Sequence, residues 1–156
     1  MPLVGNVNWI DIIGLYIHLA GFVIGLGAVT VIDLHGFLGR KSSYWTEATT
    51  RTHKVTKPLI WLGLLLVIIG AIIFYRNRVW SLALLAQAII VCALMINGIF
   101  LSFKVSPFLI QREKEGRAAE LLPTAWQKKI TIAFLVSFAG WWSELLLTVY
   151  QVMLYR

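Results

Sequence analysis

The chain has 156 residues, of which 59% are hydrophobic and 13% are charged, whereas a soluble domain is nearer half apolar and a quarter charged. This composition excludes an ordinary soluble enzyme and indicates a small integral membrane protein. The single cysteine, Cys92, lies in an apolar run, which excludes a disulfide framework and a cysteine metal cluster. The net charge of +7 comes from Lys and Arg between apolar segments, a pattern typical of topology signals and not of a nucleic-acid-binding surface.

Four apolar segments predict one transmembrane domain over residues 1–156. They run over about 9–38, 58–75, 79–103 and 126–150, and each approaches the roughly 20 residues that a helix needs to cross a bilayer. The predicted fold is therefore all-α, a polytopic four-helix bundle. The second segment is the shortest, and we expect its helix to begin before Pro58. The residues before the first segment have no basic n-region, so we expect this segment to remain as an anchor and not to be a cleaved signal peptide.

The connections predict how the helices are placed in the membrane. The turn at 76–78 is so short that the second and third helices should be antiparallel neighbours. The mixed charges over 111–123 predict a short helix at the cytoplasmic surface. All basic residues except Arg76, Arg78 and Arg156 lie between segments one and two or around the connection of segments three and four. The positive-inside rule then predicts a protein of the cell (inner) membrane with both larger loops cytoplasmic and both termini outside.

Three polar residues fall at one depth in the outer half of the predicted bundle. At about 1.5 Å per residue, His18, Gln87 and Glu144 lie at similar levels on segments one, three and four. His18 belongs to a stripe of small residues that repeats at helical spacing from Gly14 to Ala28, where another helix can approach closely. Glu144 shares a face with other polar and small residues of segment four, so we expect it to point into the bundle. The spacing does not fix the direction of Gln87.

This layer has a structural interpretation and several functional ones. The structural interpretation is a hydrogen bond between His18 and Glu144 that holds two helices together. The functional ones are a haem whose iron takes His18, a proton relay through Glu144 and His18, and a pocket for a small ligand or quinone between the helices. Ionisable residues inside a membrane are functional-site candidates by default, so all of these stay open.

A second polar layer lies toward the predicted cytoplasmic side. It contains Asp33, Asn97 and Lys104, and the last two are seven residues apart and should share a helix face. An ion pair of Asp33 with Lys104 or Arg40 would make an intramembrane carboxylate tolerable, so we expect this layer to be structural. Tryptophans at 80, 141 and 142 are predicted to form a belt at the membrane interface.

Three short motifs resemble a group of membrane proteins. The run Asp33-Leu34-His35-Gly36-Phe37-Leu38-Gly39 after a helix with an early histidine is similar to several four-span bacterial membrane families. These families distantly resemble the membrane protoporphyrinogen-oxidase and copper-resistance D-type proteins. The runs Lys57-Pro58-Leu59-Ile60-Trp61 and Asn97-Gly98 resemble the corresponding positions. The likeness covers the topology of most of the chain, and its motifs are short.

The resemblance implies a haem-binding or redox-associated bundle. Its haem-binding members use a histidine of the first helix, which His18 matches, and a lysine early in the third helix, where this chain has the uncharged Gln87. The expectation is haem b with His18 on the iron and with Gln87 and Glu144 nearby; any enzymatic activity would be oxidoreductase-like. Two alternatives remain: a non-enzymatic accessory or assembly subunit that packs through its glycine stripe, and a proton-coupled carrier or channel that uses Glu144. The expected partners are the lipid bilayer and either further copies of the chain or the subunits of a membrane complex.

Overall fold

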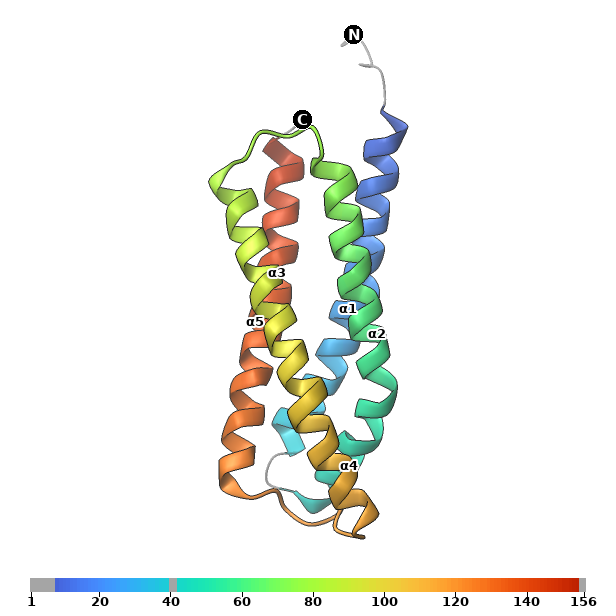
Figure 1. The fold of residues 1–156 in the computed structure, drawn as a ribbon, viewed down its shortest axis with the longest axis vertical. Helices are drawn as coiled ribbons and strands as arrows, with labels where there is room; N and C mark the ends of the chain where they lie inside the picture. The colour runs from blue at the N-terminus through green and yellow to red at the C-terminus, as the bar shows by residue number, and fades with distance from the viewer. Residues whose placement is uncertain (1–7, 40–41, 155–156) are drawn as a thin grey trace.

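Four long antiparallel helices form the molecule (Figure 1). The computed structural model describes residues 8–39 and 42–154. The long helices are α1 (Trp9–Gly39), α2 (Ser43–Tyr75), α3 (Leu82–Phe100) and α5 (Thr124–Leu154). Helix α3 continues through a π-helical turn, η1 (Leu101–Val105), into α4 (Ser106–Lys114). The described residues contain no strand, so the predicted all-α four-helix bundle is confirmed.

All four predicted membrane spans correspond to helices that are long and apolar enough to cross a membrane. The apolar stretches run over 9–38, 50–75, 82–114 and 124–154. The second begins before Pro58, as predicted, because a proline within a transmembrane helix is tolerated when neighbouring groups satisfy the freed carbonyl. These features make the chain a membrane protein by length and composition.

The third span extends further than predicted, because its helix continues through Pro107 instead of ending before this residue. Pro107 has no N–H and its ring would clash with the carbonyl one turn earlier. The π turn η1 lies just before it, and a wider turn moves that carbonyl away from the ring. The helix expected at 111–123 is therefore the end of this continuous rod: α4 begins already at Ser106 and ends at Lys114.

Glycines bring α1 and α2 into close contact over most of their length. A Cβ added to Gly63 of α2 would collide with the backbone of Gly25 on α1. A Cβ on Gly70 would likewise collide with the backbone of His18. The predicted glycine stripe of α1 is thus covered from within the chain by α2, which leaves it less free for a partner subunit.

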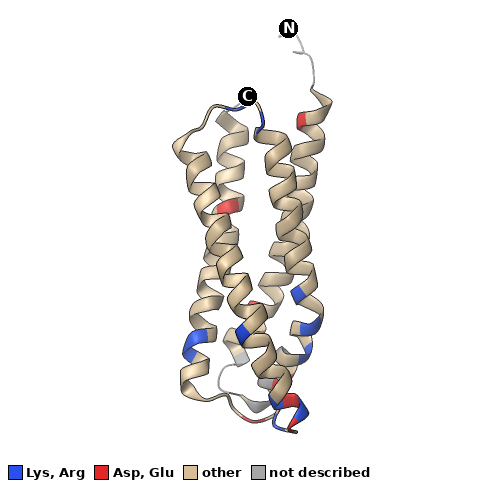
Figure 2. Ribbon diagram, in the orientation of Figure 1, with Lys and Arg blue, Asp and Glu red and all other residues tan. Residues whose placement is uncertain are grey.

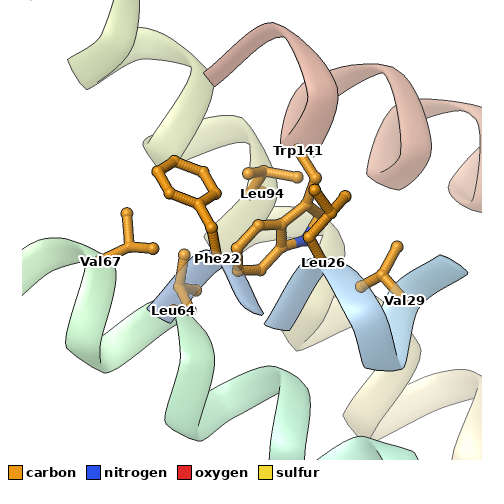
Figure 3. Packing of buried hydrophobic residues seen from close by; sticks show 7 residues of the cluster. All are labelled: Phe22, Leu26, Val29, Leu64, Val67, Leu94 and Trp141. Atoms are coloured by element: carbon orange, nitrogen blue, oxygen red, sulfur yellow. The ribbon is translucent and has the colours of Figure 1, made fainter. Parts of the chain in front are cut away.

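A tryptophan occupies the centre of the hydrophobic core. Trp141 of α5 is 1% exposed, and it packs with Phe22 and Leu26 of α1, Leu64 of α2 and Leu94 of α3 (Figure 3). The expectation that Trp141 belongs to an interfacial belt is wrong. Its ring fills the space that the missing side chain of Gly25 leaves, so helix α5 can approach α1 closely.

The two ends of the bundle differ in charge. Both ends of the described chain lie with the α2–α3 turn at one end, called here the terminal end (Figure 1). Lys and Arg gather mainly at the opposite end, the loop end (Figure 2). The extensive helix contacts are α1 with α2, α3 with α5, and α1 with α5. Helices α2 and α3 are antiparallel as predicted, yet they contact each other little, and two cavities lie between them.

Candidate functional site

The three residues predicted to share a layer do so, and two further residues of α5 join them. His18, Gln87 and Glu144 are at most 3% exposed. Thr148 and Gln151, each 1% exposed, lie one and two turns beyond Glu144 on the same buried face of α5. The structure therefore places an imidazole, two amides, a carboxyl and a hydroxyl from three helices within one polar cluster, called here the polar layer.

Thr148 is the centre of the polar layer. Its hydroxyl oxygen lies 3.0 Å from Nε2 of His18 and accepts a hydrogen bond of 2.9 Å from Nε2 of Gln87. The same oxygen lies 3.0 Å from the backbone carbonyl of Glu144. The amide of Gln151 in turn donates to Oε1 of Gln87. The predicted direct bond between His18 and Glu144 is not formed, because the threonine one turn later is the residue that faces the histidine.

The hydrogen bonds of His18 leave two ways to place its protons. Nδ1 lies 2.7 Å from the carbonyl oxygen of Val67, which only accepts, so Nδ1 carries a proton and donates. The Thr148 hydroxyl has a single proton. If that proton points to Nε2, His18 is neutral. If it points to the Glu144 carbonyl, a neutral His18 has no hydrogen bond at Nε2, and only an imidazolium can donate from there. The rotation of one hydroxyl is thus coupled to the charge of the histidine.

His18 does not suit haem iron in this arrangement. An axial ligand needs the lone pair of a ring nitrogen. Nδ1 is bonded to Val67 and Nε2 faces Thr148, and the side chain is 0% exposed between Phe22 and Tyr75, whose rings lie 5.0 and 6.2 Å away. Haem on His18 stays a prediction that a visible absorption spectrum checks.

A pocket of about 360 Å³ reaches the polar layer from the terminal end. This terminal-end pocket lies between α2 and α3, with Arg76, Arg78 and Trp80 near the turn and with Gln87 and Glu144 among its deeper walls. The remaining wall is mainly apolar. Arg76 is held by Asp11 through an ion pair of 2.7 Å. The pocket is therefore a path from the charged rim to the buried carboxyl.

Glu144 has an unsatisfied oxygen. Its side chain is 2% exposed, and Gln87 lies within hydrogen-bonding reach of the carboxyl group. The second oxygen, Oε2, has no hydrogen-bond partner. A buried carboxylate without full partners is costly in a membrane, which makes an incoming proton or donor group favourable at this position.

In the described residues, the second predicted layer lacks one of the two ion pairs expected for Asp33, the one with Lys104. Lys104 is exposed and forms no ion pair with Asp33 among the residues described, because the wider turn of η1 changes its angular position relative to Asn97. Asn97 instead donates a 2.8 Å hydrogen bond to the carbonyl of Ala133 on α5. The alternative partner, Arg40, lies outside the described residues. Asp33 faces a second cavity, of about 90 Å³.

Comparison of the chain with protein-family models, with curated proteins and with solved structures finds no match. The resemblance to four-span bacterial membrane families therefore stays a prediction.

Sequence reasoning missed the central role of Thr148 and the contribution of Val67. Thr148 did carry a signal, because it follows Glu144 by one helical turn on the same polar face. No pattern in the sequence indicated the role of the Val67 carbonyl. It accepts the hydrogen bond from His18 because Gly70 lets α2 approach that residue, a contact that no spacing within one helix reveals.

Proposed function

We propose that the chain is a proton-coupled membrane carrier in which Glu144 exchanges a proton through the terminal-end pocket. The observation that carries this proposal is the free Oε2 of a buried carboxyl in the wall of a pocket that extends to the end of the bundle. A structural carboxyl would be expected to have both oxygens satisfied by protein. A carboxyl group that exchanges a proton has to keep one oxygen without a protein partner, so that a proton donor can approach it.

The polar layer supports this role because its hydrogen bonds connect the carboxyl group of Glu144 to His18. Gln87 contacts the carboxyl group and also bonds Thr148, which in turn bonds His18. A change at Glu144 can thus reach the histidine through three hydrogen bonds. The Thr148 hydroxyl has one acceptor in each charge state of His18, so its rotation can follow a change in the charge of the histidine.

The alternatives have less support from the geometry. A haem protein would need His18 to give up an internal hydrogen bond. An accessory subunit that packs through the α1 stripe would need a surface that α2 already covers. Under the positive-inside expectation the terminal end faces outside the cell, which would make the pocket an external entry.

Proton flux into proteoliposomes tests the carrier. The protein is reconstituted with trapped pyranine, and a potassium gradient with valinomycin drives proton entry. We expect Glu144→Gln, which keeps the shape and removes the exchangeable proton, to reduce the protein-dependent rate by about tenfold or more.

Glu113→Gln is the matched control. Glu113 pairs with Lys54 at the loop end, outside the polar layer, and the variant should keep the rate of the unmodified protein. Equal rates for the unmodified protein and Glu144→Gln, with both folded in the vesicles, would rule out the role of Glu144.

A further inference from the structure

The rim of the terminal-end pocket carries an excess of positive charge. Arg76 and Arg78 line the pocket beside the α2–α3 turn, and Asp11 of α1 pairs with the first of them. Two guanidinium groups and one carboxylate leave one positive charge in excess among the described residues of the rim. A ligand with a single negative charge would therefore complement this rim.

Arg76 keeps the side of its guanidinium group that suits a carboxylate. Within the described residues, its side chain donates to Asp11 and to the carbonyl of Ile73, and both bonds come from Nη1. The N–H groups on Nε and Nη2 point in parallel, the arrangement with which arginine holds a carboxylate through two hydrogen bonds. The side chain is 29% exposed, so protein does not enclose it.

Below the rim, the pocket offers mainly apolar surface. Its aliphatic wall is formed by α2 and α3 and consists of Val67, Ile68, Ala71, Ile72, Leu84, Ala88 and Val91. Trp80 adds an indole ring at the rim. A small inorganic anion would gain nothing from this wall, whereas an apolar body joined to the anionic group would be buried by it. The pocket therefore favours an amphipathic anion.

The deep end of the pocket determines which way such a ligand lies. Glu144 belongs to this end, where the surroundings are apolar and the repulsion between two carboxylates is strong. The rim offers the opposite charge. The anionic group of the ligand should therefore lie at Arg76, with its apolar body directed toward Glu144.

The volume limits the size of the ligand. A cavity of about 150 Å³ holds benzene, which has about six non-hydrogen atoms, and the same ratio allows about 14 in this pocket. The pocket measures about 360 Å³. We infer that it binds an amphipathic monocarboxylate, with the carboxylate on Arg76 and the apolar body between α2 and α3. This inference rests on the proposed function for any transport of the ligand, but binding can be measured without flux.

Equilibrium binding of tritiated 1-naphthoate, which lies within this size limit, tests the inference. The full-length protein is placed in nanodiscs of phosphatidylcholine, a lipid without net charge, and binding to empty nanodiscs is subtracted. We expect saturable binding that unlabelled 1-naphthoate displaces. Neither 1-naphthamide, which has the same shape without the charge, nor acetate, which has the charge without the rings, should displace it at equal concentration. Absence of saturable binding, or equal displacement by either compound, would overturn the assignment.

Variants of the rim test the position of the carboxylate. Arg76→Gln should weaken binding by about tenfold or more, because two charge-assisted hydrogen bonds are lost. Arg76→Lys keeps the charge without the parallel donors and should weaken binding by about threefold. Arg51→Gln is the matched control. It removes an arginine from an ion pair with Glu47 at the loop end and should bind like the unmodified protein.

A variant of the wall tests the pocket without changing any charge. Ala71→Phe places a ring in the space that the naphthyl group needs, so binding should weaken by about tenfold or more. Unchanged binding by a folded Arg76→Gln protein would contradict the role of the rim. Should that variant fail to fold, Ala71→Phe decides, and unaltered affinity there would show that the ligand binds elsewhere.

Binding and proton flux can fail separately. Glu144→Gln leaves the rim unchanged, so it should still bind 1-naphthoate even where it abolishes proton flux. Loss of binding in that variant would contradict the placement of the carboxylate at the rim. Saturable binding to a protein whose flux does not depend on Glu144 would support the ligand site and refute the carrier, whereas Glu144-dependent flux without saturable binding would do the reverse.

Discussion

At the scale of single residues, the polar layer depends on one hydroxyl. Thr148 bonds both His18 and Gln87, and the side chains of these two residues are at most 3% exposed. Removal of this hydroxyl should cost more stability than removal of the hydroxyl of a surface threonine, because two buried polar groups lose a hydrogen-bond partner at once.

We therefore expect Thr148→Val, which keeps the shape and removes the hydroxyl, to destabilise the protein by about 1–3 kcal/mol. Thr148→Ser retains the hydrogen bonds and should have a smaller effect. Unfolding in mixed micelles of detergent and SDS, followed by circular dichroism, measures both. A valine variant as stable as the serine variant would mean that the hydrogen bonds contribute little.

The position of a single residue could be predicted where the geometry of one helix decides it, and not where the packing of two helices decides it. The common depth of His18, Gln87 and Glu144 could be predicted, because the rise per residue is fixed. The partner of His18 could not, because helix rotation and approach decide it. Trp141 was misplaced for a similar reason: a tryptophan near a predicted interface is equally suited to a buried site opposite a glycine, and only the packing of Gly25 distinguishes them.

At the scale of elements, the α1–α2 pair is the most tightly defined part of the bundle. Its glycines meet backbone to backbone, so an added methyl group has no flexible neighbour to displace. The small-residue stripe was visible in the sequence, whereas the identity of the helix that covers it was not.

Gly63→Ala tests this interface. The new Cβ would collide with the backbone of Gly25, so we expect about 1–3 kcal/mol of destabilisation from forced separation of the helices. Gly27→Ala is the matched control, since its Cβ would meet nothing within 4 Å and alanine is the better helix former. Thermal unfolding of both variants in detergent makes the comparison, and equal midpoints would contradict close packing at Gly63.

The third span shows what sequence patterns alone leave open at this scale. Its apolar character predicted a helix up to Phe103, but the chain continues in helical form to Lys114 because a π turn accommodates Pro107. Hydropathy reports where side chains favour lipid. It does not report how the backbone accommodates a proline within a helix. The angular position of Lys104 could not be predicted, because this residue lies in the π turn that accommodates Pro107.

At the scale of the whole molecule, the charge distribution predicts the orientation in the membrane. The loop end carries most of the lysines and arginines (Figure 2), so it should face the cytoplasm. The carrier proposal places its proton entry at the opposite end, which makes orientation a functional question.

Cysteine labelling in intact cells tests the orientation. In a Cys92→Ser background, Asn77→Cys in the α2–α3 turn should react with a membrane-impermeant thiol reagent, and Ala118→Cys at the loop end should react only after the cells are opened. The reverse pattern would invert the topology, and the terminal-end pocket would then open to the cytoplasm.

Because α2 and α3 contact each other little, we expect a ligand to reach the terminal-end pocket from the side. Both helices expose apolar side chains, such as Ile72 and Leu85, to the surrounding lipid, and the terminal-end pocket lies between them. We expect an amphipathic ligand to dissolve in the bilayer first and to enter sideways through this seam. Its apparent affinity in water would then rise with its partition coefficient into lipid, whereas the rate of entry would depend on the acyl chains that it must displace.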